Sequence, residues 1–287
     1  MKFFIVDVFG KERYTGNQLA VFTGCSTRSS EEMQRIAREI NFSETTFIMS
    51  GKEMNEGFDV RIFTPKAEVN FAGHPTLGTA YIIRNEILKE KVNTIKLNFK
   101  IGQIRVDFER DELFMTQIQP EFWQCFDRKL LSKVLSIEED QIDSSYPIEE
   151  VSTGLPFTIV PVKSLKVLKK IRVDAGYYNE FCSVARAKGI LVFSPEAYEA
   201  DQTFSSRVFV DYLGVPEDPA TGSGQGGFAG YLIKHKYLKK DKIDIKVGQG
   251  YEMGRPSVLA LKAMETNGRI EIRVGGKVFP VADGTWC

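Results

Sequence analysis

Two glycine-rich stretches decide the fold: Gly73-His-Pro-Thr-Leu-Gly-Thr-Ala80 and Asp218-Pro-Ala-Thr-Gly-Ser-Gly224. Each follows a strand-like segment with an Arg-x-Phe motif, which is Arg61-Ile-Phe63 in the first half and Arg207-Val-Phe209 in the second. The interval between the arginines and the interval between the two X-Pro pairs differ by two residues, which one loop can absorb. Glycine clusters of this kind mark loops that lead into helices. The repeated order therefore predicts an internal duplication, with two β-rich halves that each contain one special helix.

The composition is that of a globular protein with balanced charge. The chain has 287 residues, of which 43% are hydrophobic and 26% charged, which suits one large domain or two of ordinary size. The 38 basic and 38 acidic side chains cancel, so the sequence lacks the basic excess expected of a nucleic-acid-binding protein. The 21 Phe and 10 Tyr residues supply the apolar surface that disordered chains lack.

Targeting and metal-binding signals are missing from the sequence. The apolar run that begins at Phe3 stops at Asp7, whereas a signal peptide needs roughly 7–15 apolar residues and a membrane span about 20. We therefore expect a cytoplasmic protein that does not associate with membranes. The four cysteines are widely spaced with no Cys-x-x-Cys, and only two histidines occur, so we expect neither a metal site nor a disulfide framework.

The glycine-rich stretches also indicate a binding site. Pro75 and Pro219 suit the first positions of helices, which would place His74 and Asp218 near equivalent N-caps. Interior glycines cost a helix about 1 kcal/mol each, so either strands wrap tightly around these helices or a ligand lies against their backbone. Helix N-termini attract anions. Three hydroxyl side chains would add donors: Thr76, Thr221 and Ser223. The simpler interpretation is that these residues only start helices, and for Asp218 alone it is the better one.

Glu44 is the candidate general base and acid. It lies in Asn41-Phe-Ser-Glu-Thr-Thr-Phe47, between a predicted helix end and a predicted strand. Burial beside an apolar wall, for which Phe42 and Phe47 are the nearest candidates, would raise the pKa of this carboxylate and allow proton transfer near neutral pH. From this segment alone, a solvent-facing Glu at the start of a strand is the favoured interpretation.

Two other classes of function stay open at this point. Gly222-x-Gly224-x-x-Gly227 matches the dinucleotide fingerprint of a nucleotide-binding oxidoreductase. That fingerprint should follow a strand directly, and the preceding predicted strand ends at Asp211, so the match is weak. The other alternative is a non-catalytic ligand-binding or scaffold protein that keeps the same pocket.

Several motifs occur together along the whole chain. The first half contains Asp7-Val-Phe9, Gly16-Asn-Gln-Leu-Ala-Val21, Ser43-Glu-Thr-Thr-Phe47 and Arg61-Ile-Phe-Thr-Pro65, followed by Phe71-Ala-Gly-His-Pro-Thr-Leu-Gly-Thr-Ala80. The second half contains Val215-Pro-Glu-Asp-Pro-Ala-Thr-Gly-Ser223 and Gln249-Gly-Tyr-Glu-Met-Gly-Arg-Pro-Ser257. In this order and spacing they resemble the PhzF (phenazine biosynthesis) family.

The resemblance implies an α+β, diaminopimelate-epimerase-like fold. In that fold two similar domains each wrap a curved β-sheet or barrel around a central helix, and the active site lies in the cleft between them. We accordingly expect a first domain over residues 1–118, closed by a C-terminal strand at about 277–287, and a second over residues 129–270. Residues 120–150 are interpreted as a crossover and a linker. Members of the family commonly form homodimers, and we expect the same here.

The resemblance also implies a cofactor-independent isomerase that shifts a proton on a small carboxylate-bearing substrate. The family's general base and acid matches Glu44, and its partner positions match His74, Asp218 and Ser223. Substrate binding is expected from further residues of the same motifs: Asn17, Gly73, Pro75, Thr76, Thr221 and Gly222. Related epimerases use a pair of cysteines at the helix N-termini, but neither loop contains a cysteine, which argues against racemisation by two thiols.

Overall fold

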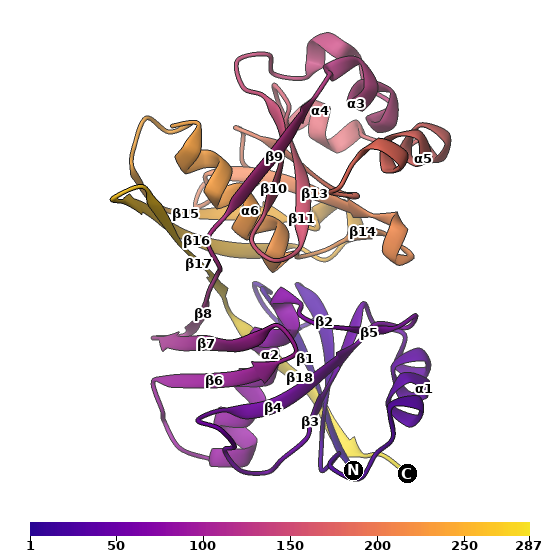
Figure 1. Cartoon of the computed structure of the whole chain (residues 1–287), viewed down its shortest axis with the longest axis vertical. Coiled ribbons are helices and arrows are strands. Elements are labelled where there is room, and N and C mark those ends of the chain that lie inside the picture. The colour runs from indigo at the N-terminus through magenta and orange to yellow at the C-terminus, as the bar shows by residue number, and fades with distance from the viewer. The chain divides into compact units, whose positions relative to one another are not determined.

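The computed structural model describes the backbone of residues 1–287 and every side chain except that of Leu213. Its contacts divide the chain into two compact units, the first formed by Met1–Thr116 with Gly275–Cys287 and the second by Gln117–Val274. The C-terminal segment therefore completes the unit in which the chain begins (Figure 1). The amide of Trp286 donates to the carbonyl of Met1 at 2.8 Å, which holds the two ends of the chain together.

In the first unit, strands pair in the order β18–β1–β2–β3–β4–β6–β7–β8, and the short β5 is added beside β4. The β2–β3 and β4–β6 pairs are parallel and the others antiparallel. The bounds are β1 (Lys2–Val8), β2 (Asn17–Thr23), α1 (Ser30–Ile40), β3 (Glu44–Ile48), β4 (Phe58–Phe63), β5 (Glu68–Val69), α2 (Gly73–Ile82), a π-helical turn (Ile83–Leu88), β6 (Thr94–Phe99), β7 (Gly102–Glu109), β8 (Glu112–Thr116) and β18 (Val278–Thr285).

The second unit pairs its strands in the order β9–β10–β11–β12–β13–β15–β16, with the short β14 beside β13. Here the β11–β12 and β13–β15 pairs are parallel. The bounds are β9 (Glu121–Phe126), α3 (Arg128–Leu135), β10 (Ile148–Ser152), β11 (Pro156–Pro161), α4 (Leu165–Lys170), α5 (Ala175–Val184), β12 (Gly189–Ser194), β13 (Phe204–Val210), β14 (Val215–Asp218), α6 (Gly222–Lys234), β15 (Lys242–Gln249), β16 (Ser257–Thr266) and β17 (Arg269–Gly276).

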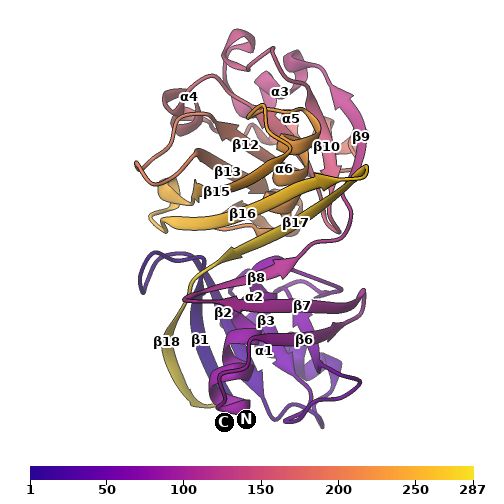
Figure 2. The same ribbon diagram turned by 90° about the vertical axis from the view of Figure 1, so that its left-hand side faces the viewer.

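The two units repeat the same succession of pairings. Each begins with an antiparallel pair, β1–β2 or β10–β11, from which a helical connection leads to a parallel strand, β3 or β12. An antiparallel strand with a short strand beside it follows, β4 with β5 or β13 with β14. One buried helix then leads to a second parallel strand, β6 or β15. The helix α2 of the first unit thus corresponds to α6 of the second (Figures 1 and 2). This repetition is the duplication that the paired glycine-rich stretches predict.

Both central helices are enclosed by strands and buried on all sides. Helix α2 contacts β1, β2, β3, β6, β7, β8 and β18, and α6 contacts β10, β11 and β16. A Cβ atom at Gly78 of α2 would lie 2.5 Å from the Leu19 side chain and 2.9 Å from that of Val8. Only glycine permits so close an approach, so Gly78 serves the tight wrapping of α2 by strands.

The sheets are covered on their other face by the remaining helices. Helix α1 packs through Met33, Ile36 and Ala37 onto Phe22 and Phe47 of the first sheet. It begins as its sequence predicts, because the Ser29 hydroxyl accepts from the amide of Glu32, and it ends at the left-handed Asn41. Helices α3, α4 and α5 share one apolar cluster with strands of the second sheet.

Three expectations about local structure are wrong. Residues 120–150 are not a linker: they contain β9 and α3, whose apolar residues belong to the core of the second unit. Helix α2 begins at Gly73, so Pro75 is its third residue, where the missing N–H still costs no intrahelical bond. Asp218 is no N-cap, because it ends β14 and α6 begins at Gly222 with Thr221 as its N-cap.

Aligning the two helix starts changes the correspondence between the halves. Gly73 then matches Gly222 and Gly78 matches Gly227, so glycines recur at the same helical positions. His74 is the second residue of its helix, and the second residue of α6 is Ser223. Ser223, rather than Asp218, is therefore the counterpart of His74 within the duplicated fold.

An arginine–glutamate pair occurs at the same place in each unit, partly buried in the first and more deeply buried in the second. Arg61 of β4 donates two hydrogen bonds of 2.8 Å to the carboxylate of Glu68 on β5. Arg207 of β13 binds Glu217 of β14 in the same bidentate way, at 2.8 and 2.7 Å. These pairs fix the short strands that lead into the central helices. The Arg61 hydrogen bonds lower the pKa of Glu68 to about 2.

The Glu68 pair should stabilise the fold in a pH-dependent way. Its pKa is depressed from 4.5 to about 2, so the stabilisation is fully present above pH 4.5 and is lost as the pH falls through 2. Glu68→Gln should lower the free energy of unfolding by roughly 1.5–3 kcal/mol at neutral pH. Urea denaturation at a series of pH values should show this difference shrinking steadily below pH 4.5.

Glu56→Gln is the matched control. Glu56 also meets a cation, Lys96 at 2.9 Å, but its side chain is 81% exposed, and exposed ion pairs contribute little. The control should stay close to the wild-type stability at every pH. Equal losses in the two variants would contradict the structural role assigned to Glu68.

Candidate active site

Glu44 and His74 lie together in the first unit. Glu44 is the first residue of β3, and its parallel pairing with Leu19 of β2 places it beside the start of α2. His74, the second residue of α2, is 4% exposed. The Nε2 atom of His74 is 3.6 Å from Oε2 of Glu44, whose side chain is 16% exposed. The fold therefore brings Glu44 and His74, the two first-half candidates, next to each other.

His74 is neutral in this site. Burial lowers the pKa of its imidazole to about 3, and a hydrogen bond to the backbone of Gln18 opposes this shift only in part. A bond that favours the protonated ring is one in which the ring donates. Nε2 has no hydrogen-bond partner within the part of the chain that the structure describes, so Nδ1 carries the proton. The contact with Glu44 is therefore not an ion pair, and Nε2 faces the carboxylate as an acceptor.

The prediction that Phe42 and Phe47 form an apolar wall beside Glu44 is wrong. Side chains alternate between the two faces of a strand, so Phe47 points away from Glu44. Phe47 and the partly buried Phe42 pack instead into the cluster beneath α1. The neighbour of Glu44 on the inner face is Thr46, whose hydroxyl accepts from Thr79 of α2 at 2.9 Å.

The other first-half candidates surround the start of α2. Gly73, Pro75 and Thr76 form its buried first turn, and Thr76 donates its hydroxyl proton to the carbonyl of Ala72 at 2.8 Å. The Thr76 hydroxyl is thus bound to the N-cap residue of its own helix. Asn17 is buried at the start of β2, opposite Val8. The backbone N–H groups of the first turn are those that have no partner inside the helix.

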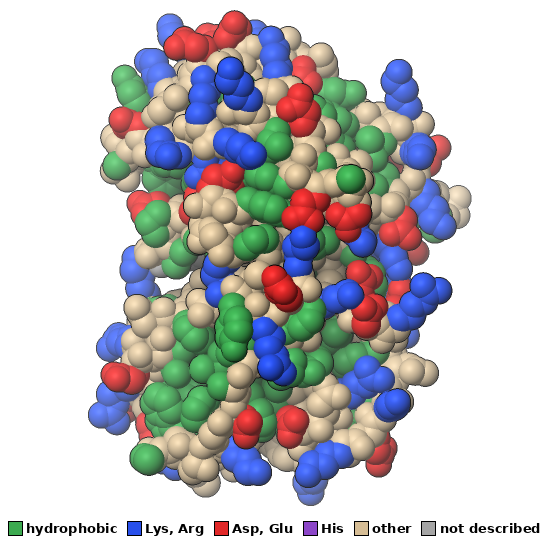
Figure 3. All heavy atoms as spheres, turned by 180° about the vertical axis from the view of Figure 1, so that it is seen from behind, with side chains coloured by type: hydrophobic (Ala, Val, Ile, Leu, Met, Phe, Trp, Pro, Cys, Tyr) green, Lys and Arg blue, Asp and Glu red, His purple; other side chains and the backbone are tan. Residues whose placement is uncertain are grey.

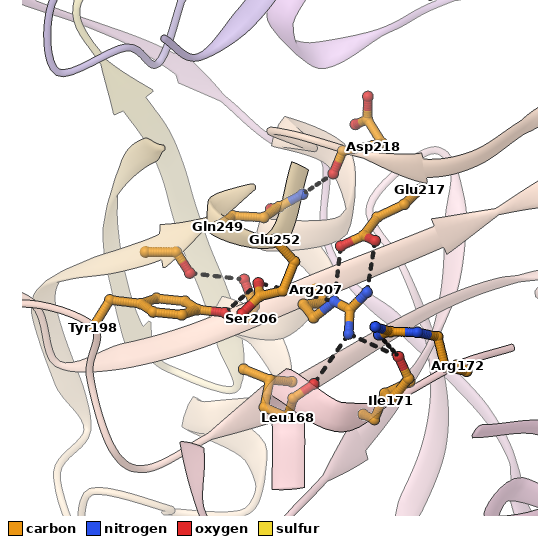
Figure 4. Close-up of polar contacts among 11 residues, drawn as sticks. Leu168, Ile171, Arg172, Tyr198, Ser206, Arg207, Glu217, Asp218, Gln249 and Glu252 are labelled. Carbon is orange, nitrogen blue, oxygen red and sulfur yellow. Dashed lines mark hydrogen bonds and ion pairs between the residues drawn. The ribbon is translucent and has the colours of Figure 1, made fainter. Parts of the chain in front are cut away.

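In the second unit, Asp218 and Thr221 belong to a buried polar network. Asp218 is 8% exposed, and its Oδ2 accepts from the Thr221 hydroxyl. Gln249 of β15 donates through Nε2 to the main-chain oxygen of Asp218 at 2.8 Å (Figure 4). The same nitrogen donates to Oγ1 of Thr221 at 3.0 Å. Ser223 is buried in the first turn of α6, next to Gly222.

The glycines of α6 pack against protein. A Cβ atom at Gly226 would lie 2.7 Å from the Thr153 hydroxyl and 2.8 Å from Oε1 of Gln117. A short strand, β14, does end just before this region, which the sequence did not indicate. Gly226 therefore meets a packing requirement, whereas at Gly224 and Gly227, two glycines of the fingerprint, a Cβ atom would lie at an ordinary contact distance of 3.4 Å.

Residues that the sequence did not mark as functional hold the second-half candidates in place. Gln249, Gln225 and Arg207 are buried and bind the segment around Asp218 directly or through a neighbour. The sequence carries part of their signal, because Gln249 opens one of the motifs that resemble the family and Arg207 opens the repeated Arg-x-Phe. Their partners, however, depend on strand register.

Comparisons with known proteins identify the family of the chain. The family model described as "Phenazine biosynthesis-like protein" (PhzC-PhzF) matches residues 6–284. The chain belongs to this family. It is 32% identical, over 99% of its own length and 98% of the relative's, to trans-2,3-dihydro-3-hydroxyanthranilate isomerase of Pseudomonas aeruginosa. Relatives of this kind make the chain an isomerase of the PhzF type.

Solved structures of other proteins share the fold of this chain. A PhzF-family phenazine biosynthesis protein of Bacillus anthracis superposes with a TM-score of 0.90 at 26% identity, covering 99% of this chain and 98% of that one. A hydroxyproline epimerase of Agrobacterium vitis gives a TM-score of 0.64 at 9% identity, covering 99% of this chain and 91% of that one, which shows the fold alone. The predicted α+β, diaminopimelate-epimerase-like fold is confirmed.

Charged side chains of both signs are spread over the surface. Basic and acidic side chains are interspersed within both units on the face drawn in Figure 3. Among the residues that the structure describes, none of the helices has both the length and the apolar character that a membrane span requires.

The protonation state of His74 can be measured directly. ¹⁵N NMR of the imidazole rings should show His74 as the neutral Nδ1–H tautomer with no titration between pH 5 and 8, because burial lowers its pKa to about 3. The chain has only two histidines, so His235→Gln assigns the signals. An inflection in that range, on the resonance that His74→Gln removes, would show that the ring takes up a proton.

Proposed function

We propose that the protein is a cofactor-independent isomerase in which Glu44 moves a proton between two carbons of a small carboxylate-bearing substrate. The observation that carries this proposal is the pairing of the Glu44 carboxylate with the neutral Nε2 of His74 at 3.6 Å. An imidazolium there would hold Glu44 as a permanent ion pair. A neutral acceptor leaves the carboxylate able to take a proton and release it.

The proton transfer follows from these two groups. Glu44 removes a proton from an acidic carbon, and the electron pair of that C–H bond is delocalised towards the substrate's own unsaturated or carboxyl group. The protonated carboxyl then faces Nε2 of His74, an acceptor to which it can donate after a small movement. Glu44 returns the proton to a second carbon, so the substrate isomerises without oxidation or reduction. General acid–base catalysis by a single residue is typically worth about 10²–10⁴ in rate.

The remaining candidates would bind and orient the substrate. The first turns of α2 and α6 offer backbone N–H groups and a positive helix end, which suit a carboxylate. Asn17, Gly73, Pro75 and Thr76 belong to the first of these regions and Thr221, Gly222 and Ser223 to the second. Asp218 contributes a second carboxylate, held by Thr221. In this proposal Asp218 and Ser223 contact the substrate and steady the charge that develops on it.

The first substrate to test is trans-2,3-dihydro-3-hydroxyanthranilate, which the Pseudomonas aeruginosa relative's name specifies. Incubation in D₂O with ¹H NMR should show a new isomer or exchange of one carbon-bound proton. If this acid is inert, a panel of small cyclic and unsaturated acids extends the same assay. Failure of every acid to exchange or isomerise would contradict the proposed reaction class.

Glu44→Gln should lower kcat by at least about 10²-fold while binding and folding stay nearly intact, because the amide keeps the shape but cannot take the proton. His74→Gln and Asp218→Asn should have smaller effects if these residues position the substrate. Glu39→Gln, a change of the same kind at an exposed position of α1, is the control and should behave as wild type. Nearly full turnover by Glu44→Gln would exclude Glu44 as the base and direct attention to Asp218.

A further inference from the structure

The motif Gln249-Gly-Tyr-Glu-Met-Gly-Arg-Pro-Ser257 has no part in the chemistry proposed above. Gln249 ends β15 and is fully buried, which is costly for a carboxamide unless its hydrogen bonds are satisfied. Gly250 follows in the left-handed conformation with a φ of 78°. A Cβ atom there would lie 2.5 Å from the carbonyl oxygen of Pro219. The motif is therefore pressed against the segment that carries Asp218.

The Gln249 carboxamide joins the end of β14 to the start of α6. Its Nε2 donates to the main-chain oxygen of Asp218 at 2.8 Å and to Oγ1 of Thr221 at 3.0 Å. Its Oε1 accepts from Nε2 of Gln225 at 3.0 Å and from the amide of Thr221 at 3.4 Å. Both amide protons and both oxygen lone pairs are thus engaged.

These contacts fix the direction of every bond in the network. Turning the amide over would set Oε1 against the carbonyl oxygen of Asp218, where two acceptors would repel, so only one orientation is satisfied. In that orientation Oγ1 of Thr221 must accept from Gln249. The single hydroxyl proton of Thr221 is then free to go to Oδ2 of Asp218, where the structure places a hydrogen bond.

The backbone on the other side of Asp218 is held as well. The bidentate pair between Arg207 and Glu217 anchors the preceding residue, and Arg207 also donates to the carbonyls of Leu168 and Ile171 at 3.1 and 3.0 Å. In Figure 4 the Asp218 carboxylate points away from Arg207, while its main-chain oxygen turns towards Gln249. The Asp218 carboxylate is bound by the Thr221 hydroxyl, and that hydroxyl is in turn bound by Gln249.

We infer that Gln249 is a positioning residue that orients the Asp218 carboxylate through the Thr221 hydroxyl. This inference rests on the proposed role of Asp218 in substrate binding and adds a cause for its geometry. Gln249 binds the main-chain oxygen of Asp218 and the Thr221 hydroxyl, and it acts on the Asp218 carboxylate through them. The arrangement makes Asp218 an acceptor at Oδ2.

Two substitutions test the relay. Gln249→Glu keeps the shape but replaces the donor Nε2 with an acceptor, so the bonds to Asp218 and Thr221 are lost and the Thr221 hydroxyl can turn to the new carboxylate. Thr221→Val removes the hydroxyl and keeps the bulk. With trans-2,3-dihydro-3-hydroxyanthranilate as the probe, both should lower kcat by up to roughly 100-fold, as for a misplaced reacting group, and change KM far less.

Gln202→Glu is the matched control. Gln202 is buried in the same unit, and its Nε2 donates to the Tyr251 hydroxyl at 2.7 Å. It should lose thermal stability to a similar extent while keeping kcat near the wild-type value. A fall in kcat as large as that of Gln249→Glu would show that the effect reports general damage to the unit, and it would overturn the inference.

A double-substitution cycle separates positioning from structure. If Gln249 acts through Asp218, then Asp218→Asn combined with Gln249→Glu should be no slower than Asp218→Asn alone, because the coupled residues are not additive. Multiplied effects would contradict the relay. If Asp218→Asn keeps wild-type turnover, the proposed role of Asp218 fails instead.

Crystal structures decide the geometry without any substrate. The Asp218 side chain should leave its wild-type rotamer in both Gln249→Glu and Thr221→Val and keep it in Gln202→Glu. An Asp218 carboxylate that stays in place in both test variants would overturn the inference, whatever their activities.

Discussion

The contact between each central helix and the strands around it sets the rest of the structure. At Gly78 the strands approach so closely that a single methyl group would overlap Leu19 and Val8. A helix enclosed in this way cannot slide or tilt without many unfavourable contacts, since protein interiors are close-packed. Its first turn is therefore fixed against the ends of β2 and β3. His74 and Glu44 owe their 3.6 Å separation to that packing.

The same enclosure determines the protonation state. His74 is buried because α2 is buried, and burial lowers the pKa of its ring to about 3. The neighbouring carboxylate therefore faces a neutral nitrogen. In the second unit the corresponding helix position is Ser223, a residue without a titratable group near neutral pH, and the polar network joins the Asp218 carboxylate to a hydroxyl and two amides. One fold, used twice, thus brings a carboxylate next to an imidazole in one unit and holds a carboxylate in a hydrogen-bond network in the other.

The sequence predicts the duplication and the fold class because their signals are local. It marks Glu44 and His74 separately as candidates, and their contact appears only in the structure. Paired glycine stretches, a capping box at Ser29 and the family motifs need no knowledge of tertiary contacts. Other features depend on register and packing. Phe47 lies on the face of β3 opposite to Glu44, Asp218 ends a strand three residues before the N-cap of α6, and residues 120–150 contain β9 and α3 in place of a linker. The role of Gln249 could not be read from its motif, since its partners lie 24 to 31 residues away in the sequence.

The claim that one carboxylate carries the proton in both directions is tested most directly by isotope transfer. The substrate would be trans-2,3-dihydro-3-hydroxyanthranilate, or the acid found active in its place, deuterated at the carbon that loses its proton and converted in H₂O in a single turnover. A protonated carboxyl holds only the proton it removed, so a measurable fraction of the product should carry deuterium at the carbon that gains a proton. Complete loss of the label to solvent, at every reaction time, would contradict a single shielded carboxylate and require a separate acid.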